Sequence, residues 1–136
     1  MKIFLWTLGV IVVAGGLILG VKSMKQADVS SFPGQYDTFA QCLKDSGATF
    51  YGAFWCPHCQ DQKKDFGSSD RLLPYVECST VDEKGQTAVC KEKGIISYPT
   101  WIFKDTSQVS GKVDWKTLSE KTGCSLPANA PESALR

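Results

Sequence analysis

The apolar residues of this chain fall into one long run near the N-terminus and several shorter runs after it. Residues 4–21 are uncharged and mostly apolar, and Lys2 and Lys22 flank them. A helix of this length, at about 1.5 Å per residue, spans about 27 Å, close to the hydrocarbon thickness of a bilayer. We therefore predict that residues 1–25 are a transmembrane signal anchor. A cleavable signal peptide is the competing interpretation, but the apolar run is longer than usual and no small-residue cleavage site follows it closely.

Shorter patterns follow a linker at residues 26–35, which contains serines, a proline and a glycine. Apolar residues at helical spacing predict a first helix that is capped by Asp37 and ends near Gly47. The further predicted elements are, in chain order, a strand at 49–55, a helix at 57–66, a strand at 72–78, a helix at 86–93, a hairpin with strands at 100–103 and 108–110, and a helix from an Asp114 cap to Gly123. This alternation predicts an α/β domain over residues 36–124, with a mixed sheet of about four strands between helices and a disordered tail at 125–136.

The strand predicted at 49–55 leads directly into two cysteines that are separated by two residues, Cys56-Pro57-His58-Cys59. Pro57 fits the first turn of the following helix, where its missing N–H is not needed. Cys56 precedes the free N–H groups and the positive end of the helix dipole, which favour an anion. Because such surroundings depress a thiol pKa to about 3.5–7.5, we expect Cys56 to be the reactive, largely ionised sulfur and Cys59 its resolving partner. A protonated His58 would favour the thiolate further.

The same side chains also allow a metal site. Cys56, His58 and Cys59 are soft ligands that suit Zn²⁺ or Cu(I). A structural zinc site needs four ligands, usually from two spaced pairs, whereas this chain has one histidine and its other four cysteines are scattered. We therefore favour redox chemistry by the two thiols without a metal or cofactor, and a metal-binding module remains the alternative.

Three separated motifs carry a resemblance to a known family. The motifs are residues 50–63 around the cysteine pair, residues 73–78, and residues 94–101 with Ser97-Tyr98-Pro99-Thr100. Together they resemble the thioredoxin superfamily. They are most similar to the thioredoxin-like domain that is fused to, or partnered with, bacterial vitamin K epoxide reductase homologues. The resemblance covers residues 36–124 and implies a thioredoxin-like fold.

The resemblance also implies a site and an activity. Its site would contain a cis Tyr98–Pro99 bond beside the cysteine pair, with Cys56 as the attacking sulfur. The backbone at Tyr98 would then be free to pair with an extended substrate segment that carries a cysteine to Cys56. Trp55 is a candidate for the same substrate platform, although core packing explains it equally well. The implied activity is an extracytoplasmic dithiol oxidase or its relay.

Our expectation for the direction of electron flow rests on one difference between this chain and the reductases of the family. These reductases carry a buried carboxylate six residues before the first cysteine, where this chain has Phe50. Without that carboxylate, removal of the proton from Cys59 is expected to be slow. The dipeptide Pro57-His58 is that of DsbA-type oxidases, in which a stabilised thiolate makes the reduced form the lower-energy state. We therefore favour disulfide donation, and keep a reductase or isomerase fed by a membrane electron carrier as an alternative.

The other four cysteines allow three pairings. Cys78 and Cys90 are close enough in sequence for a local bridge. By restricting the unfolded chain, such a bridge would stabilise the folded state by about 3 kcal/mol. Cys42 and Cys124 would then tie the ends of the domain together or remain buried free thiols. Six cysteines in so short a chain suit an oxidising compartment.

This cysteine content sets the expected location. We predict a single pass through the cytoplasmic membrane, with the N-terminus in the cytoplasm and the catalytic domain outside. The expected partners are exported substrate proteins with cysteines and a quinone-linked membrane redox protein of the vitamin K epoxide reductase or DsbB type. The net charge of +1 gives no sign of a nucleic-acid partner.

Overall fold

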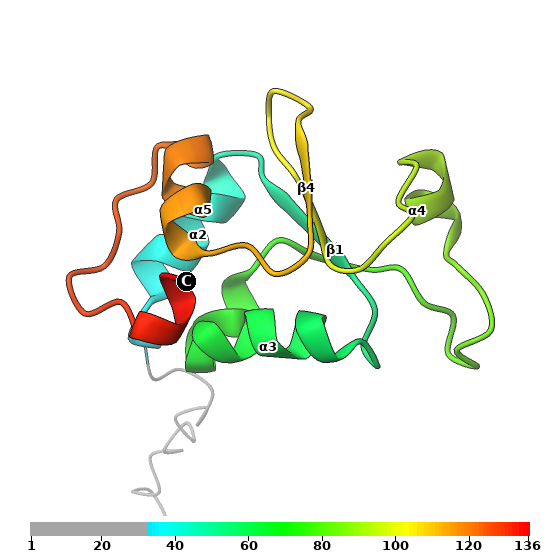
Figure 1. The fold of residues 1–136 in the computed structure, drawn as a ribbon, viewed down its shortest axis with the longest axis horizontal. Helices are drawn as coiled ribbons and strands as arrows, with labels where there is room; N and C mark the ends of the chain where they lie inside the picture. The colour runs from blue at the N-terminus through cyan, green and yellow to red at the C-terminus, as the bar shows by residue number, and fades with distance from the viewer. Residues whose placement is uncertain (1–32) are drawn as a thin grey trace, which may run out of the picture. The chain divides into compact units, whose positions relative to one another are not determined.

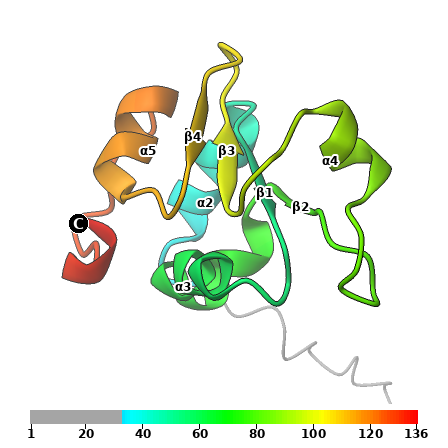
Figure 2. The ribbon, with the colours of Figure 1, turned by 45° about the vertical axis from the view of Figure 1, so that its right-hand side comes forward.

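Four short strands form the central sheet of the computed structural model, which describes residues 33–136. Strand β1 (Thr49–Gly52) is paired in parallel with β2 (Tyr75–Glu77) and in antiparallel with β3 (Thr100–Ile102). Strand β4 (Gln108–Ser110) continues the sheet as the antiparallel partner of β3, so the order is β2-β1-β3-β4 (Figure 1, Figure 2). The mixed α/β sheet of four strands expected from the sequence is confirmed.

Helices cover both faces of this sheet. They are α2 (Asp37–Asp45), α3 (Pro57–Asp65), α4 (Ala88–Glu92) and α5 (Trp115–Thr122), with short 3-10 helices η2 (Gly67–Leu72) and η3 (Glu132–Ala134). Buried residues of α2, α3 and α5 share one hydrophobic cluster, whereas the buried residue of α4 belongs to a second, smaller cluster. Figure 2 shows α4 on the side of the sheet away from α2 and α5.

Strand β1, an inner strand of the sheet, contributes buried residues to both hydrophobic clusters. Successive residues of a strand point to opposite faces, so Phe50 enters the large cluster and Tyr51 the small one. Phe50 lies opposite Trp101 in the β1–β3 register, and their rings stack with centroids 5.0 Å apart. Both side chains are fully buried. This aromatic pair holds β1, and with it the cysteine pair that follows, in the core of the domain.

The starts of helices α5 and α2 are stabilised by different interactions. Helix α5 begins as predicted, because the Asp114 carboxylate accepts a hydrogen bond from the Thr117 backbone N–H at 2.9 Å. Asp37, which the sequence predicts as the cap of α2, is instead the first residue of that helix. The Asp37 carboxylate instead binds the Arg71 guanidinium at 2.6 Å and the Gly34 backbone N–H. A partner that is distant in sequence therefore replaces the local capping role.

Other differences lie at the ends of elements, where α4 is shorter than the helix predicted at 86–93, and at the C-terminus. β1 ends at Gly52 rather than residue 55, and β2 begins at Tyr75 rather than residue 72 because η2 occupies the preceding residues. The expected disordered tail at 125–136 is instead folded against the domain. Its Ala134 is fully buried, because η3 packs beside the end of α3.

The predicted anchor at residues 1–25 lies outside the described residues, as does most of the predicted linker. Residues 33–136 contain no helix with the length and apolar character that a bilayer crossing requires.

Candidate active site

Cys56 and Cys59 lie at the N-terminal end of α3, where the sequence places them. Cys56 occupies the N-cap position with extended backbone angles, and Pro57 takes the first helical position. The Gln60 backbone N–H donates to the Cys56 carbonyl and closes the first turn. The two sulfurs differ in access, since Cys56 is 6 % exposed and Cys59 only 1 %. Both cysteines are buried, and Cys56 is the more accessible of the two.

Gly52 makes room for the inner sulfur. A Cβ atom at Gly52 would lie 2.9 Å from Cys59 Sγ and 2.9 Å from Cε2 of Tyr75. Such contacts are too short to exist, so any larger residue at this end of β1 would displace Cys59 or the Tyr75 ring. Sequence reasoning missed Gly52, although a glycine inside a buried strand is a known sign of a close approach.

The inner thiol holds its proton strongly. Burial raises the pKa of Cys59 to about 12, and the neighbouring Cys56 sulfur adds to the rise against a lowering backbone contact from Ala53. Phe50 takes the position where a reductase would carry a carboxylate, and it is fully buried. Cys59 therefore stays a neutral thiol around neutral pH.

Glu77 fixes the turn that precedes Cys56. Its carboxylate accepts hydrogen bonds from the backbone N–H of Ser79 at 2.8 Å and from that of Phe54 at 3.3 Å. It also accepts the Tyr75 hydroxyl at 2.6 Å, and burial together with this bond raises the pKa of Tyr75 above its ordinary value. The end of β2 is thereby joined to the turn between β1 and α3. Glu77 lies within the motif at residues 73–78, but sequence reasoning assigned it no role.

Two aromatic side chains stand beside Cys56. The Tyr98–Pro99 bond is cis, as the family resemblance implies, and Cys56 Sγ lies 3.6 Å from the Tyr98 carbonyl oxygen. Trp55 and Tyr98 meet edge to face, with ring centroids 6.1 Å apart. Trp55 is 43 % exposed, which separates it from the buried tryptophans Trp101 and Trp115.

The ligands for a metal are not assembled. Within residues 33–136, no three His, Cys, Asp or Glu side chains are grouped as metal ligands require. His58 is exposed at the start of α3. The metal-binding alternative for Cys56, His58 and Cys59 therefore gains no support from this part of the chain.

The other cysteines form two disulfides. Cys78 is bonded to Cys90, with Cα atoms 5.5 Å apart, and Cys42 to Cys124, with Cα atoms 5.9 Å apart. The Cys78–Cys90 bridge is the one that the sequence spacing favoured, and the Cys42–Cys124 bridge is one of the two outcomes that it left open. Cys56 and Cys59 are the free cysteines, so the thiols available for exchange are those at the start of α3.

Comparison with known proteins agrees with a thiol site. No protein-family model matches the chain. A curated protein, thiol-disulfide oxidoreductase LTO1 of Arabidopsis thaliana, is 39% identical over 106 residues. The alignment covers 74% of this chain and 28% of that protein, so the chain spans less than a third of the length of this relative. With the α/β fold, the similarity supports a thioredoxin-like oxidoreductase.

Proposed function

We propose that this chain is a thiol:disulfide oxidoreductase that donates the Cys56–Cys59 disulfide to proteins with cysteines. The observation that carries the proposal is the asymmetry of the pair. Cys56 lies at the N-terminus of α3 beside the Tyr98 carbonyl, whereas Cys59 is enclosed and firmly protonated. The Cys56 sulfur is placed to exchange with a substrate thiol. The Cys59 sulfur is placed to form the internal disulfide with Cys56.

The proposed reaction moves two electrons from the substrate to the protein. A substrate thiolate attacks Cys56 Sγ in the oxidised protein, a bond forms between the two sulfurs, and the bond from Cys56 to Cys59 breaks. Cys59 leaves with the electron pair and takes up a proton. The second thiolate of the substrate then attacks the substrate sulfur of the mixed disulfide and releases Cys56. The substrate gains a disulfide, and the protein becomes the dithiol.

The protonation of Cys59 favours donation over reduction. Burial is the main cause of the high Cys59 pKa, and burial does not depend on whether Cys56 is bonded to a substrate. Only a thiolate can attack a disulfide, so Cys59 seldom cleaves the mixed disulfide at Cys56 and returns the substrate unchanged. The substrate's own second thiol therefore has time to complete the transfer.

The activity can be tested on a reduced peptide with two cysteines. We expect the oxidised protein to convert it to the disulfide form. The Cys56→Ser variant should be inactive, and Cys59→Ala should accumulate a mixed disulfide through Cys56. The redox potential should lie well above the value of about −270 mV that is typical of thioredoxin. A potential as reducing as that value would reject disulfide donation and favour the reductase or isomerase alternative.

We further propose that residues 1–25 anchor the protein in the cytoplasmic membrane with the catalytic domain outside. A quinone-linked membrane protein of the vitamin K epoxide reductase or DsbB type would reoxidise the pair. The apolar run at 4–21 and the two structural disulfides support this location. In intact cells, a membrane-impermeant thiol reagent should label Cys56 after mild reduction. Labelling only after lysis, or recovery of the full chain without membranes, would contradict the proposal.

A further inference from the structure

One loop is hydrogen-bonded to both aromatic side chains beside Cys56. The Trp55 indole N–H donates to the Ser79 hydroxyl at 2.8 Å, and the Gln86 amide donates to the Tyr98 hydroxyl at 2.8 Å. Ser79 and Gln86 are the two ends of the loop at residues 79–86, and they face each other as an antiparallel bridge. The two aromatic side chains are distant in sequence, and besides their own edge-to-face contact each is hydrogen-bonded to one end of this loop.

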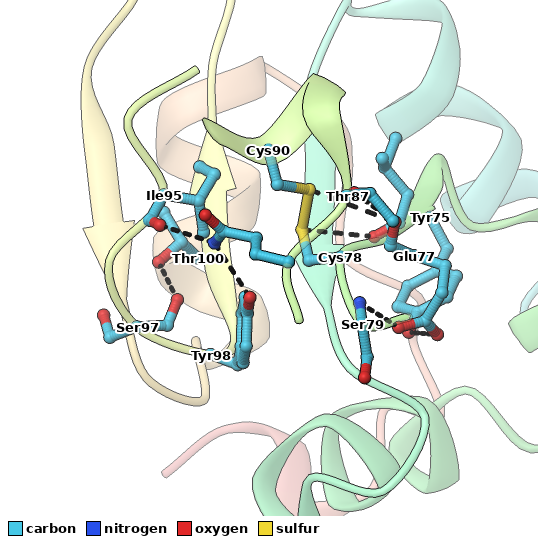
Figure 3. The surroundings of a disulfide bond; sticks show 12 residues. Tyr75, Glu77, Cys78, Ser79, Thr87, Cys90, Ile95, Ser97, Tyr98 and Thr100 are labelled. Carbon is cyan, nitrogen blue, oxygen red and sulfur yellow. Dashed lines mark hydrogen bonds between the residues drawn. A yellow bond between two sulfur atoms is a disulfide. The ribbon is translucent and has the colours of Figure 1, made fainter. Parts of the chain in front are cut away.

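The base of the 79–86 loop is fixed on every side. The Cys78–Cys90 disulfide closes it, and the Thr87 hydroxyl donates to the Glu77 carbonyl at 3.1 Å. The Gln86 amide makes a second bond, to the Ile95 carbonyl at 2.7 Å, in the segment that leads to Tyr98. Figure 3 shows the disulfide together with Ile95 and Tyr98. The two ends of the loop are therefore tied to β2, to α4 and to the segment that leads to Tyr98.

The hydrogen-bond donors of the Ser79 and Gln86 side chains are all used. The Ser79 hydroxyl donates to the Thr80 carbonyl at 3.0 Å, so its lone pairs are left to accept the Trp55 indole N–H. Both N–H groups of the Gln86 amide have acceptors, the Ile95 carbonyl and the Tyr98 hydroxyl. Ser79 is also buried. Such satisfied side chains fix the rotamers of the partners to which they bond.

We propose that Ser79 and Gln86 are positioning residues of the thiol-exchange site. They hold Trp55 and Tyr98 at right angles, so that a peptide segment is received in one orientation above Cys56. This inference rests on the proposed oxidoreductase function, because it concerns how that site receives its substrate. Neither residue contacts the reacting sulfurs; each acts through the aromatic side chain to which it is bonded.

Steady-state kinetics with two kinds of dithiol separate positioning from chemistry. One substrate is a peptide with two cysteines, and the other is dithiothreitol, which is too small to need aligned aromatic side chains. In Ser79→Ala and in Gln86→Leu, we expect the KM for the peptide to rise about fivefold, as one lost hydrogen bond implies. The kcat for the peptide and the rate with dithiothreitol should not change. Lys84→Gln, at an exposed position of the same loop, is the matched control.

Double variants test whether the effect passes through the aromatic partner. Trp55→Phe removes the indole N–H, so adding Ser79→Ala to it should raise the KM no further. Tyr98→Phe and Gln86→Leu should behave in the same way. Additive effects in both pairs, or an equal loss of rate with the peptide and with dithiothreitol, would overturn the positioning role.

A measurement without turnover keeps the two proposals apart. Hydrogen exchange at the Trp55 indole N–H, followed by NMR, should be faster in Ser79→Ala and unchanged in Lys84→Gln. Unchanged exchange in Ser79→Ala would overturn the inference whatever the activity is. A wild-type protein that oxidises neither dithiol but shows the expected exchange would reject the proposed function and leave the support of Trp55 standing.

Discussion

At the scale of single residues, the site depends on how differently two sulfurs three positions apart are treated. Cys56 retains a small exposure at the N-terminus of α3, while Cys59 fills a space that exists because Gly52 has no side chain. The motif predicted this pair and its place at a helix start. It did not predict Glu77, because a carboxylate on a strand acquires its role only when β2 is placed beside the turn before Cys56.

The pKa of Cys59 predicts a loss of stability at high pH. The folded value is about 12 against an ordinary thiol value of 9.0, so the folded state prefers the protonated form. This contribution is complete below pH 9.0 and is lost as pH rises from there to about 12. We expect the free energy of unfolding of the reduced protein to fall through this window. Denaturant titrations at several pH values would measure the change.

Other groups also titrate at high pH, so the comparison needs two references. The oxidised protein has no Cys59 thiol, and the Cys59→Ala variant lacks the sulfur altogether. Both should lose less stability between pH 9.0 and about 12 than the reduced wild type. Parallel curves for all three proteins would contradict a raised Cys59 pKa.

At the scale of elements, the sequence predicts the bounds of a helix correctly where residues at its own two ends determine them. Helix α5 starts at the Asp114 cap and stops at Gly123, whose φ of 76° suits glycine. Helix α2 was less predictable at its start because Asp37 is bound to Arg71, which the sequence does not bring near it. The same reason explains the shorter β2, since η2 depends on tertiary packing.

The Asp114 cap gives a test at this scale. Replacing Asp114 with alanine leaves the Thr117 backbone N–H without its side-chain acceptor. We expect a loss of about 1 kcal/mol in the free energy of unfolding, as for other N-cap residues. Chemical denaturation measures it, with Lys116→Ala, an exposed residue of the same helix, as the control. Equal effects of the two substitutions would contradict the capping role.

At the scale of the whole domain, two disulfides have different tasks. Cys78–Cys90 closes a local loop beside the site, whereas Cys42–Cys124 joins residues 82 positions apart. The loop pairing was predictable from spacing, because few alternatives exist for close cysteines. The supporting bonds from Ser79 and Gln86 were not, since they depend on where the closed loop comes to lie against Trp55 and Tyr98.

The long-range disulfide predicts a large effect on stability and a small one on exchange. Changing Cys42 and Cys124 together to serine should lower the free energy of unfolding by about 2–5 kcal/mol, because the unfolded chain gains freedom. The rate of peptide oxidation at a temperature where the variant is folded should stay the same. Thermal unfolding and the peptide assay would show this. A stability equal to that of wild type would mean that the bridge is dispensable.

The folded C-terminal segment also determines where a fusion partner or a surface can be attached to the domain. Ser133 lies by Asp65 at the far end of α3 from Cys56, and the Tyr36 hydroxyl donates to the Asn129 carbonyl near the start of the domain. Both extremities of the domain therefore emerge at the pole opposite the reactive sulfur. A fusion partner or surface linkage at either extremity would leave the Cys56 end of α3 free to meet a large, still unfolded client.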